Sequence, residues 1–388
     1  MDYFVTKYES DCPGGAARAV LEDSIMHKGR PATAGSKILE NFISPLDATV
    51  ITRLEAAGVC IPGKTKMDEF GCSGLFGNSE LLSGSVDAVA DGVADFALCN
   101  DYTGAVSSYA AARGLCYIHP TYGSVSRYGL IPAVQSMDQI GVVCRTPAEG
   151  FRALSMIAGL DPKDGAMFPD AERNSDFGIP KSEFRIGVPK NVLTQIPDSQ
   201  ASAVNEFVKE LTTVEFELKY FGAYAAVMRI LCCAELSNNI TRYDGIKFGY
   251  RTENYDGLRE IYTKSRTEAF GEDTKLAAII GSMVLSRGNY MRYYDKAMRI
   301  RRMIKESLCF DQYDAIVMPC GAGSGIAGQE TSGDCVGQNA ALALALHALP
   351  RLCGLPAVSL PYGSGGLTLI ADRRNEDVLV SALKAVKQ

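Results

Sequence analysis

The sequence predicts an α/β protein in which a mixed or parallel sheet is covered by helices. Short apolar runs of strand length alternate with longer helical patterns along the chain. The 388 residues are 47% hydrophobic and 22% charged, a composition that supports a large buried core. Because no internal repeat, low-complexity tract or linker interrupts the pattern, we expect one domain over residues 1–388.

The first sixty residues predict a loosely attached start followed by a helix and a strand. Residues 1–15 are polar and end in CPGG, and a short helix is expected over 16–28. The next segment places Val50, Leu54 and Ala57 on one helical face and stops at Gly58. A buried strand is expected over Val59–Ile61, with Gly63 and Lys64 leaving its end, where open α/β sheets place ligands.

The remaining elements follow from apolar periodicity and turn residues. We expect, in chain order, a helix from Ser85 to Ala94, a strand at Phe96–Cys99, a helix at 105–113, a strand at Leu115–His119, a helix at 145–158, a strand at 184–189, a helix at 199–213, a largely helical region at 223–310, strands at 313–320, in AVSLPYG and in LTLIAD, and a closing helix at 376–387.

Composition restricts the function classes. The net charge of −6 and pI near 5.3 give no global electrostatic case for nucleic-acid binding. Twelve cysteines without a CxxC pair and three separated histidines predict no metal centre, and we expect no cofactor. The acidic start MDYFVTKYESD does not resemble a signal peptide, and no apolar run is long enough to span a membrane. We therefore expect a cytoplasmic protein with buried free thiols.

The stretch CNDYTGAVSSYAAARG, residues 99–114, has the pattern of an active-site turn. An apolar strand leads through Asp101 and a Thr-Gly turn into a helix. Backbone N–H groups at such a turn can hold an oxyanion, and a nucleophile often stands beside them. Here the residue at that position is Ala105, which has no side-chain oxygen.

Several motifs in one order resemble the amidase signature family, and more narrowly the A subunits of the tRNA-dependent amidotransferases. They are SKILENF with DATV, GKTKMDEF, TYGSVSRYGLIPAVQSMDQIG, RYDGIKFGYR and the run from SRTEAFGED to LSRGNY. The resemblance implies a mixed, mostly parallel sheet with helices on both faces, and a reduced N-terminal segment at 1–28. It also implies amide hydrolysis by a Ser–cis-Ser–Lys triad, in which burial must lower the lysine pKa before it can act as a base.

Carried over residue by residue, the resemblance indicates a degenerate site. Lys64 matches the family base, whereas Leu82 falls at the bridging-serine position and Ala105 at the nucleophile. Tyr102, Thr103 and Gly104 match the oxyanion turn. The substrate pocket would involve Asp101, Tyr122, Arg127, Tyr128 and Cys320, and the family's basic glutamine-holding positions fall on Leu276 and Ala277. Because several catalytic and substrate-binding positions of the family differ together in this chain, we expect a pseudoenzyme that acts as a scaffold, a regulator or a ligand-binding protein.

The alternative is an active hydrolase, or a catalytic component of an amidotransferase, with a substitute nucleophile near Lys64. Ser83 would become the bridging serine after a one-residue shift of the alignment, and Ser85, Ser107, Cys72 and Cys99 are close in sequence. Each also has a structural explanation, because cysteines in buried strands usually pack and glycine-serine loops usually turn. Lys64 itself could pair with a carboxylate such as Asp101, and Tyr122, Arg127 and Tyr128 fit loop packing equally well.

Two further motifs have ordinary explanations. GSGIAG at 323–328 matches a dinucleotide fingerprint in letters, but the polar QETSGDC that follows does not predict the required helix. The helix expected at 287–305 has a basic face above a buried stripe of Met291, Tyr294, Met298 and Ile304. Such a face supports tRNA binding only weakly. The resemblance implies B- and C-type amidotransferase subunits as partners, with a homo-oligomer as the alternative.

Overall fold

A computed structural model describes residues 2–8, 12–77, 83–168, 184–321, 333–363 and 366–385 of the chain. Its strands form one eleven-stranded sheet in the order β1-β3-β2-β4-β6-β5-β10-β11-β9-β7-β8. The strands are β1 (Phe4–Lys7), β2 (Ala19–Glu22), β3 (Gly63–Thr65), β4 (Phe96–Asn100), β5 (Cys116–His119), β6 (Ile140–Cys144), β7 (Ile186–Pro189), β8 (Thr213–Phe216), β9 (Ala315–Pro319), β10 (Ala357–Leu360) and β11 (Leu367–Ala371).

The predicted mixed α/β sheet is confirmed, but its described strand pairs are not mostly parallel. β2 runs parallel to β3 and β4, and β7 runs parallel to β8 and β9. The other six described pairs are antiparallel. The antiparallel strand β6 lies between β4 and β5, which breaks the parallel series at the centre of the sheet.

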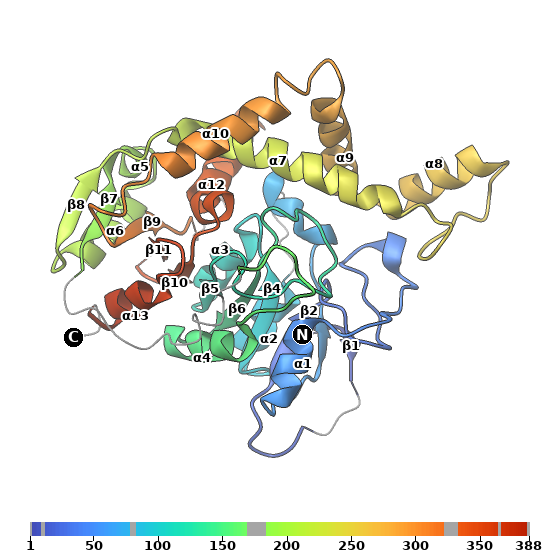
Figure 1. Cartoon of the computed structure of the whole chain (residues 1–388), viewed down its shortest axis with the longest axis horizontal. Coiled ribbons are helices and arrows are strands. Elements are labelled where there is room, and N and C mark those ends of the chain that lie inside the picture. The colour runs from blue at the N-terminus through green and yellow to red at the C-terminus, as the bar shows by residue number, and fades with distance from the viewer. Residues whose placement is uncertain are drawn as a thin grey trace.

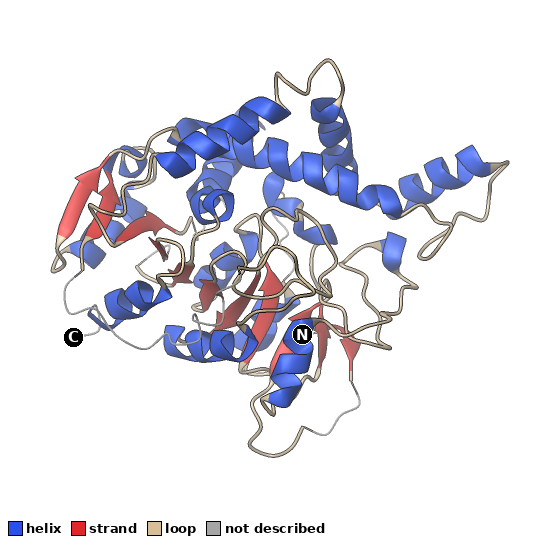
Figure 2. Ribbon diagram, in the orientation of Figure 1, coloured by secondary structure: helices blue, strands red, loops and turns tan. Residues whose placement is uncertain are grey.

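Helices cover both faces of the sheet, as predicted (Figures 1 and 2). Figure 1 shows α7, α10 and α12 on one side, and α1, α4 and α13 on the other. The helices are α1 (Thr49–Ala56), α2 (Gly84–Ala90), α3 (Ala105–Ala112), α4 (Pro147–Ile157), α5 (Lys190–Leu193), α6 (Asp198–Val208), α7 (Tyr224–Asn239), α8 (Leu258–Ala269), α9 (Glu272–Leu285), α10 (Tyr294–Glu306), α12 (Gly333–Cys353) and α13 (Glu376–Ala385).

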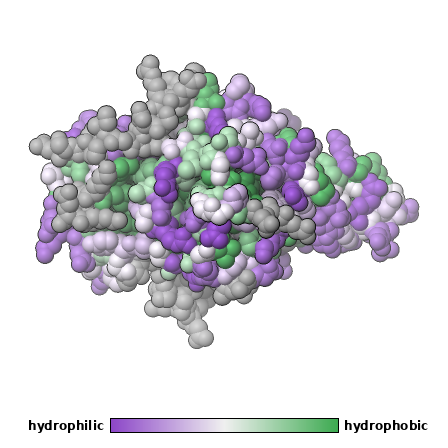
Figure 3. Space-filling view, turned by 90° about the horizontal axis from the view of Figure 1, so that it is seen from below, coloured by the Kyte–Doolittle hydropathy of each residue, from purple (hydrophilic) through white to green (hydrophobic). Residues whose placement is uncertain are grey.

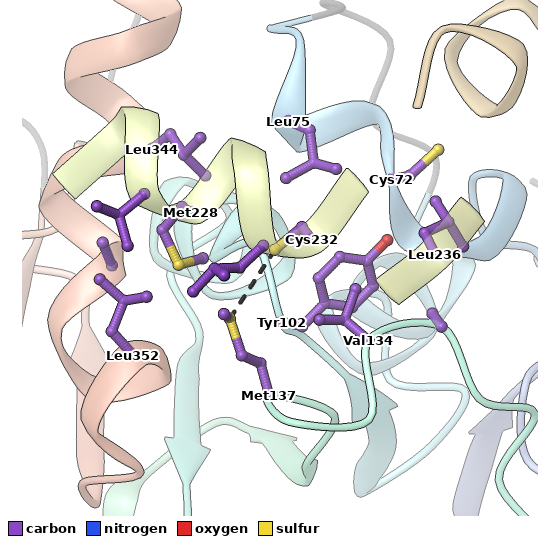
Figure 4. Close-up of a cluster of buried hydrophobic side chains, with 14 of the residues drawn as sticks. Cys72, Leu75, Tyr102, Val134, Met137, Met228, Cys232, Leu236, Leu344 and Leu352 are labelled. Atoms are coloured by element: carbon purple, nitrogen blue, oxygen red, sulfur yellow. Dashed lines mark hydrogen bonds between the residues drawn. The ribbon is translucent and has the colours of Figure 1, made fainter. Parts of the chain in front are cut away.

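Alternation along the strands divides the core between the two faces. In β9, Ile316 and Met318 pack on the side of α7 and α12, whereas Ala315 and Val317 pack on the opposite side. Figure 4 shows the cluster under α7, where Cys232 and Met137 meet and the Tyr102 ring packs among aliphatic side chains. The sheet is therefore buried on both faces, so every residue of a central strand faces one packed layer or the other.

The N-terminal region differs from the sequence-based expectation. Residues 16–28 contain β2 instead of a helix, because the apolar run Ala19–Leu21 enters the sheet between β3 and β4. The strand expected at Val59–Ile61 begins later, as β3, and places Lys64 inside the strand. The start of the chain is also fixed, since β1 pairs with β3 and Cys12 forms a disulfide with Cys60. The expectation of free thiols was wrong for these two cysteines.

Two further predictions, the start of α2 and the burial of side chains on the basic helix, differ from the structure. Ser83 caps α2, two residues before the predicted cap, because its hydroxyl accepts a hydrogen bond from the Val86 amide. The basic helix begins at Tyr294, after Met291; Met291 and Met298 are exposed, and only Ile304 of the predicted stripe is fully buried. The hydrophilic surface at the α8 end of the molecule also carries scattered apolar side chains (Figure 3). No helix within the described ranges is long and apolar enough to cross a membrane.

Candidate functional site

The turn between β4 and α3 has the architecture expected of a nucleophile site. β4 ends at Asn100, Gly104 stands at φ +91° directly before the helix, and Ala105 is the first residue of α3. A Cβ on Gly104 would lie 2.2 Å from the Cβ of His347, so both the left-handed backbone and the close approach require glycine. The residue that begins the helix is nevertheless an alanine.

The amides at the start of α3 are already hydrogen-bonded. The Asp101 carboxylate accepts from the N–H groups of Gly104 at 2.9 Å, Val106 at 3.2 Å and Ser107 at 2.9 Å. The Ala105 amide donates to the Thr103 hydroxyl at 3.3 Å. These four donors satisfy side chains within the turn, so they do not form a set of free donors for an oxyanion.

Arg351 on α12 holds Asp101 from the other side. Its guanidinium donates to the Asp101 carboxylate at 2.7 Å, to the Asp101 carbonyl at 2.9 Å and to the Ser107 hydroxyl at 3.0 Å. Both charged side chains are almost completely buried. Burial alone would raise the pKa of Asp101, but Arg351 and the amide donors outweigh it and hold the pKa below its usual value.

His347 is the unsatisfied group of this region. It lies one turn before Arg351 on α12, is buried against Gly104, and neither ring nitrogen has a well-formed hydrogen bond within the described part of the chain. Burial, reinforced by the charge of Arg351, lowers the pKa of His347 to about 4. The imidazole is therefore neutral at physiological pH and lines the turn as an uncharged polar group.

Lys64 is buried in an ion pair with Asp23 and donates two hydrogen bonds to backbone carbonyls. Its Nζ lies 2.9 Å from the Asp23 carboxylate and donates to the carbonyls of Asp23 at 3.0 Å and Pro31 at 2.9 Å. Burial lowers the pKa of Lys64, and the neighbouring Asp23 carboxylate opposes that shift. The pairing partner is thus Asp23, not the Asp101 that the sequence suggested.

Strand register separates Lys64 from the polar groups near the turn. In β3, Lys64 pairs with Leu21 of β2, and both side chains face the α1 side of the sheet. The next residue, Thr65, faces the other side, where its hydroxyl meets that of Ser85. The predicted base and the serine-bearing end of α2 therefore lie on opposite faces of the sheet.

Glu22 is the buried titratable group that does face this side, and the sequence analysis missed it. It pairs with Thr65 across the parallel strands, and its carboxylate accepts a hydrogen bond from Ser24 at 2.5 Å. Burial raises the pKa of Glu22 to about 8, and the charges of Asp68 and Asp101 contribute. An acidic residue directly after the apolar run Ala19–Leu21 was a usable signal, but the predicted helix concealed it.

The substitute nucleophiles are held in structural contacts. Ser83 caps α2 and Ser85 bonds Thr65, while Ser107 donates to the Gly104 carbonyl. Burial raises the pKa of both Cys72 and Cys99 well above the usual thiol range, which disfavours a thiolate at either. Leu82 and the GSGIAG motif lie outside the described residues.

The predicted pocket residues lie in two groups of contacts: Asp101 and Cys320 both contact Ser107, and Tyr122 and Tyr128 lie with Arg127. Tyr102, which was predicted in the oxyanion turn, has its ring in the hydrophobic cluster (Figure 4), and its hydroxyl donates to the Phe70 carbonyl at 2.9 Å. Arg127 forms an ion pair with Asp164 at 2.9 Å and donates to the Tyr122 hydroxyl at 2.7 Å. Arg127 and Tyr128 line a small cavity of about 160 Å³.

Other predicted positions are also in packed surroundings. Cys320 is buried under α3, where its thiol contacts the Ser107 carbonyl at 3.8 Å, and burial raises its pKa to about 11. On α9, Leu276 is exposed and Ala277 is buried. No cluster of three histidine, cysteine or acidic side chains suited to a metal ion occurs in the part of the chain that the structure describes.

Comparison with known proteins identifies the family. The Amidase family model matches residues 19–80 and 83–380. The chain belongs to the amidase family. It is 36% identical to the glutamyl-tRNA(Gln) amidotransferase A subunit of Lachnoclostridium phytofermentans over 91% of this chain and 76% of that protein. The protein of the same name from Trichodesmium erythraeum is 34% identical over 95% of this chain and 83% of its own length.

A solved structure shows the same fold. The crystal structure of the glutamyl-tRNA(Gln) amidotransferase A subunit from Thermotoga maritima superposes with a TM-score of 0.73, covering 98% of this chain and 85% of that one at 24% identity. The amidase fold is thus present together with Ala105 at the head of α3.

Proposed function

We propose that this amidase-family protein does not hydrolyse amides and that it acts as a scaffold, a regulator or a ligand-binding protein. The observation that carries the proposal is Ala105 at the head of α3. Alanine offers no oxygen to form an acyl-enzyme, and loss of a nucleophile leaves only the acceleration due to binding and oxyanion contacts.

Two contacts support the same conclusion. The amides of residues 104–107 donate to Asp101 and Thr103, so none of these four is free to stabilise a tetrahedral intermediate. Lys64 is paired with Asp23, donates to two carbonyls and faces away from Ser85, so we infer a structural role for this lysine. A lysine nitrogen that is held by Asp23 and two carbonyls on the opposite face of the sheet is not placed to accept a proton from a serine.

The test is hydrolysis by the purified chain together with covalent labelling. We expect no ammonia release from glutamine or asparagine, and no adduct with a fluorophosphonate or with iodoacetamide at Ser83, Ser85, Cys72 or Cys99. An active amidase of the family provides the positive control. Turnover above that control's heat-inactivated background, or an adduct on any of these side chains, would overturn the proposal.

The variant Ala105→Ser tests whether the nucleophile alone is missing or whether other catalytic groups are missing as well. If only the nucleophile were lost, this variant would acquire labelling and turnover. We expect neither, because Lys64 is paired with Asp23 on the other face of the sheet and the amides of residues 104–107 already donate to Asp101 and Thr103.

Partner proteins are a second part of the proposal. The relatives are A subunits of amidotransferases, which supports association with B- and C-type subunits in the cytoplasm; a homo-oligomer is the alternative. Affinity purification should recover such subunits, with or without tRNA. A purification that yields only a monomer of this chain would remove both partner assignments.

A further inference from the structure

A groove opens at the opposite end of β2 and β4 from the candidate site. β2 and β4 run parallel, so Arg18 and Asp95, which precede them, lie at one edge of the sheet, while Asp23 and Asp101 lie at the other. Arg145 joins this edge because Cys144, the last residue of antiparallel β6, pairs with Phe96. The groove has a volume of about 830 Å³, within the range of small-molecule sites.

Two walls and an apolar floor define the groove. One wall is the turn 13–17, held to the segment that precedes β3 by backbone hydrogen bonds at Cys60 and by the Cys12–Cys60 disulfide. The other is α4, whose residues 149, 152, 153 and 156 share one helical face. The apolar part of the lining is Phe96 at the start of β4 and Ala153 and Met156 of α4; Phe96 and Ala153 are almost completely buried and Met156 is half-buried.

The charged groups of the groove favour an anion. Three arginines line it, and none forms an ion pair with a carboxylate in the described part of the chain. Arg18 donates to the Gly92 carbonyl at 3.2 Å, and Arg145 donates to the carbonyls of Val89 at 2.8 Å and Ala94 at 3.3 Å. The exposed Arg152 guanidinium has no hydrogen-bond partner among the described residues.

The two acids of the groove are used within the protein. The Asp95 carboxylate accepts from the Arg18 backbone amide at 2.7 Å, and Glu149 closes the capping box of α4 by accepting from the Thr146 amide at 3.1 Å. These carboxylates therefore stabilise the walls, while the guanidinium groups keep donors available for a ligand.

We propose that this groove binds an amphipathic organic anion. The apolar body of the ligand lies on Phe96, Ala153 and Met156, and its carboxylate, sulfonate or phosphate group pairs with Arg18 and Arg152. The site is separate from the amidase turn and does not depend on whether that turn is active.

The experiment uses the full chain and the fluorescent probe 1-anilinonaphthalene-8-sulfonate, which joins an aromatic body to one sulfonate. We expect saturable binding that weakens as NaCl is raised, and roughly tenfold weaker binding to the double variant Arg18→Gln/Arg152→Gln, which loses two charge-assisted contacts. Arg302→Gln, on the exposed face of α10, is the matched control and should bind like the unmodified chain.

Two further measurements locate the site. Met156→Glu places an acid on the apolar floor and should also weaken probe binding, with an unchanged melting temperature showing that the fold is kept. The uncharged analogue N-phenyl-1-naphthylamine should bind more weakly than the sulfonate and be insensitive to the arginine variants. Equal sulfonate affinity in the double variant and the unmodified chain, or no saturable binding at all, would overturn the proposal.

Discussion

The charged side chains at the two ends of β2 and β4 differ in burial and in pairing. At the carboxyl end, Lys64 with Asp23 and Arg351 with Asp101 form buried pairs whose remaining donors are largely satisfied by backbone carbonyls. At the amino end, Arg18 and Arg152 lie around a groove and have no carboxylate partner in the described structure. Buried charges that are paired in this way contribute to the integrity of the fold, whereas accessible unpaired ones are available to a ligand.

The largest expected effect is at the carboxyl end. Asp23→Asn removes the partner of a lysine that stays buried, so we expect the free energy of unfolding to fall by about 3–5 kcal/mol. Chemical denaturation at pH 7 measures the change. A loss below about 1 kcal/mol, the range of exposed pairs, would abolish the distinction drawn between the two ends.

The disulfide is the strongest link at the amino end. Cys12 and Cys60 close a loop across a sequence separation of 48 residues, so Cys12→Ser should destabilise the oxidised protein by about 2–4 kcal/mol. The same variant compared under reducing conditions should differ little from the unmodified chain. A similar loss with and without reductant would show that packing of Cys12, not the covalent loop, is responsible.

The raised pKa of Glu22, at the carboxyl end of β2, predicts that the free energy of unfolding depends on pH. The folded protein holds this proton up to about pH 8, whereas the unfolded chain releases it near pH 4.5. Unfolding therefore releases a proton between these values, and Glu22 lowers stability as pH rises through them.

The variant Glu22→Gln should remove this dependence. Relative to the unmodified chain, it should gain more than about 1.4 kcal/mol between pH 5 and pH 8.5, the equivalent of one pKa unit. Denaturation curves at both pH values measure the gain, and Glu206→Gln on the exposed side of α6 is the control. A difference between variant and parent that does not change with pH would contradict the assignment.

The smallest effect is expected at the groove. Arg152→Gln changes an exposed side chain without a partner among the described residues, so stability should stay within about 0.5 kcal/mol of the unmodified chain. Thermal unfolding suffices as the measurement. A loss of about 2 kcal/mol, typical of a buried contact, would mean that Arg152 holds the fold and is not reserved for a ligand.

Sequence reasoning worked where periodicity and turn chemistry act locally. The helix that ends at Gly58, the strand before Asn100 and the helix that begins at Ala105 follow from apolar spacing and glycine position, and all three are present. The strand β2 was missed because four residues ending in Glu22 are too few to show alternation, and their burial depends on neighbours distant in sequence.

The candidate site was harder to predict than the fold. Lys64 pairs with Asp23 because Lys64 is the residue of β3 that lies opposite Leu21. A one-residue change of register would turn the Lys64 side chain to the other face of the sheet. Arg351 and His347 reach the turn from a helix distant in sequence, 250 residues on for Arg351, so no local pattern connects them to Asp101. The roles carried over to Leu82 and Ser83 remain predictions.

The Cys12–Cys60 disulfide also limits exchange of the N-terminal strand between molecules. β1 is an edge strand that could leave its own β3 and pair with the same strand of another copy, as in domain swapping. Because β1 ends at Lys7, five residues before the anchored Cys12, its free reach is at most about 18 Å in the oxidised protein. Oxidation therefore tethers this edge to its own sheet.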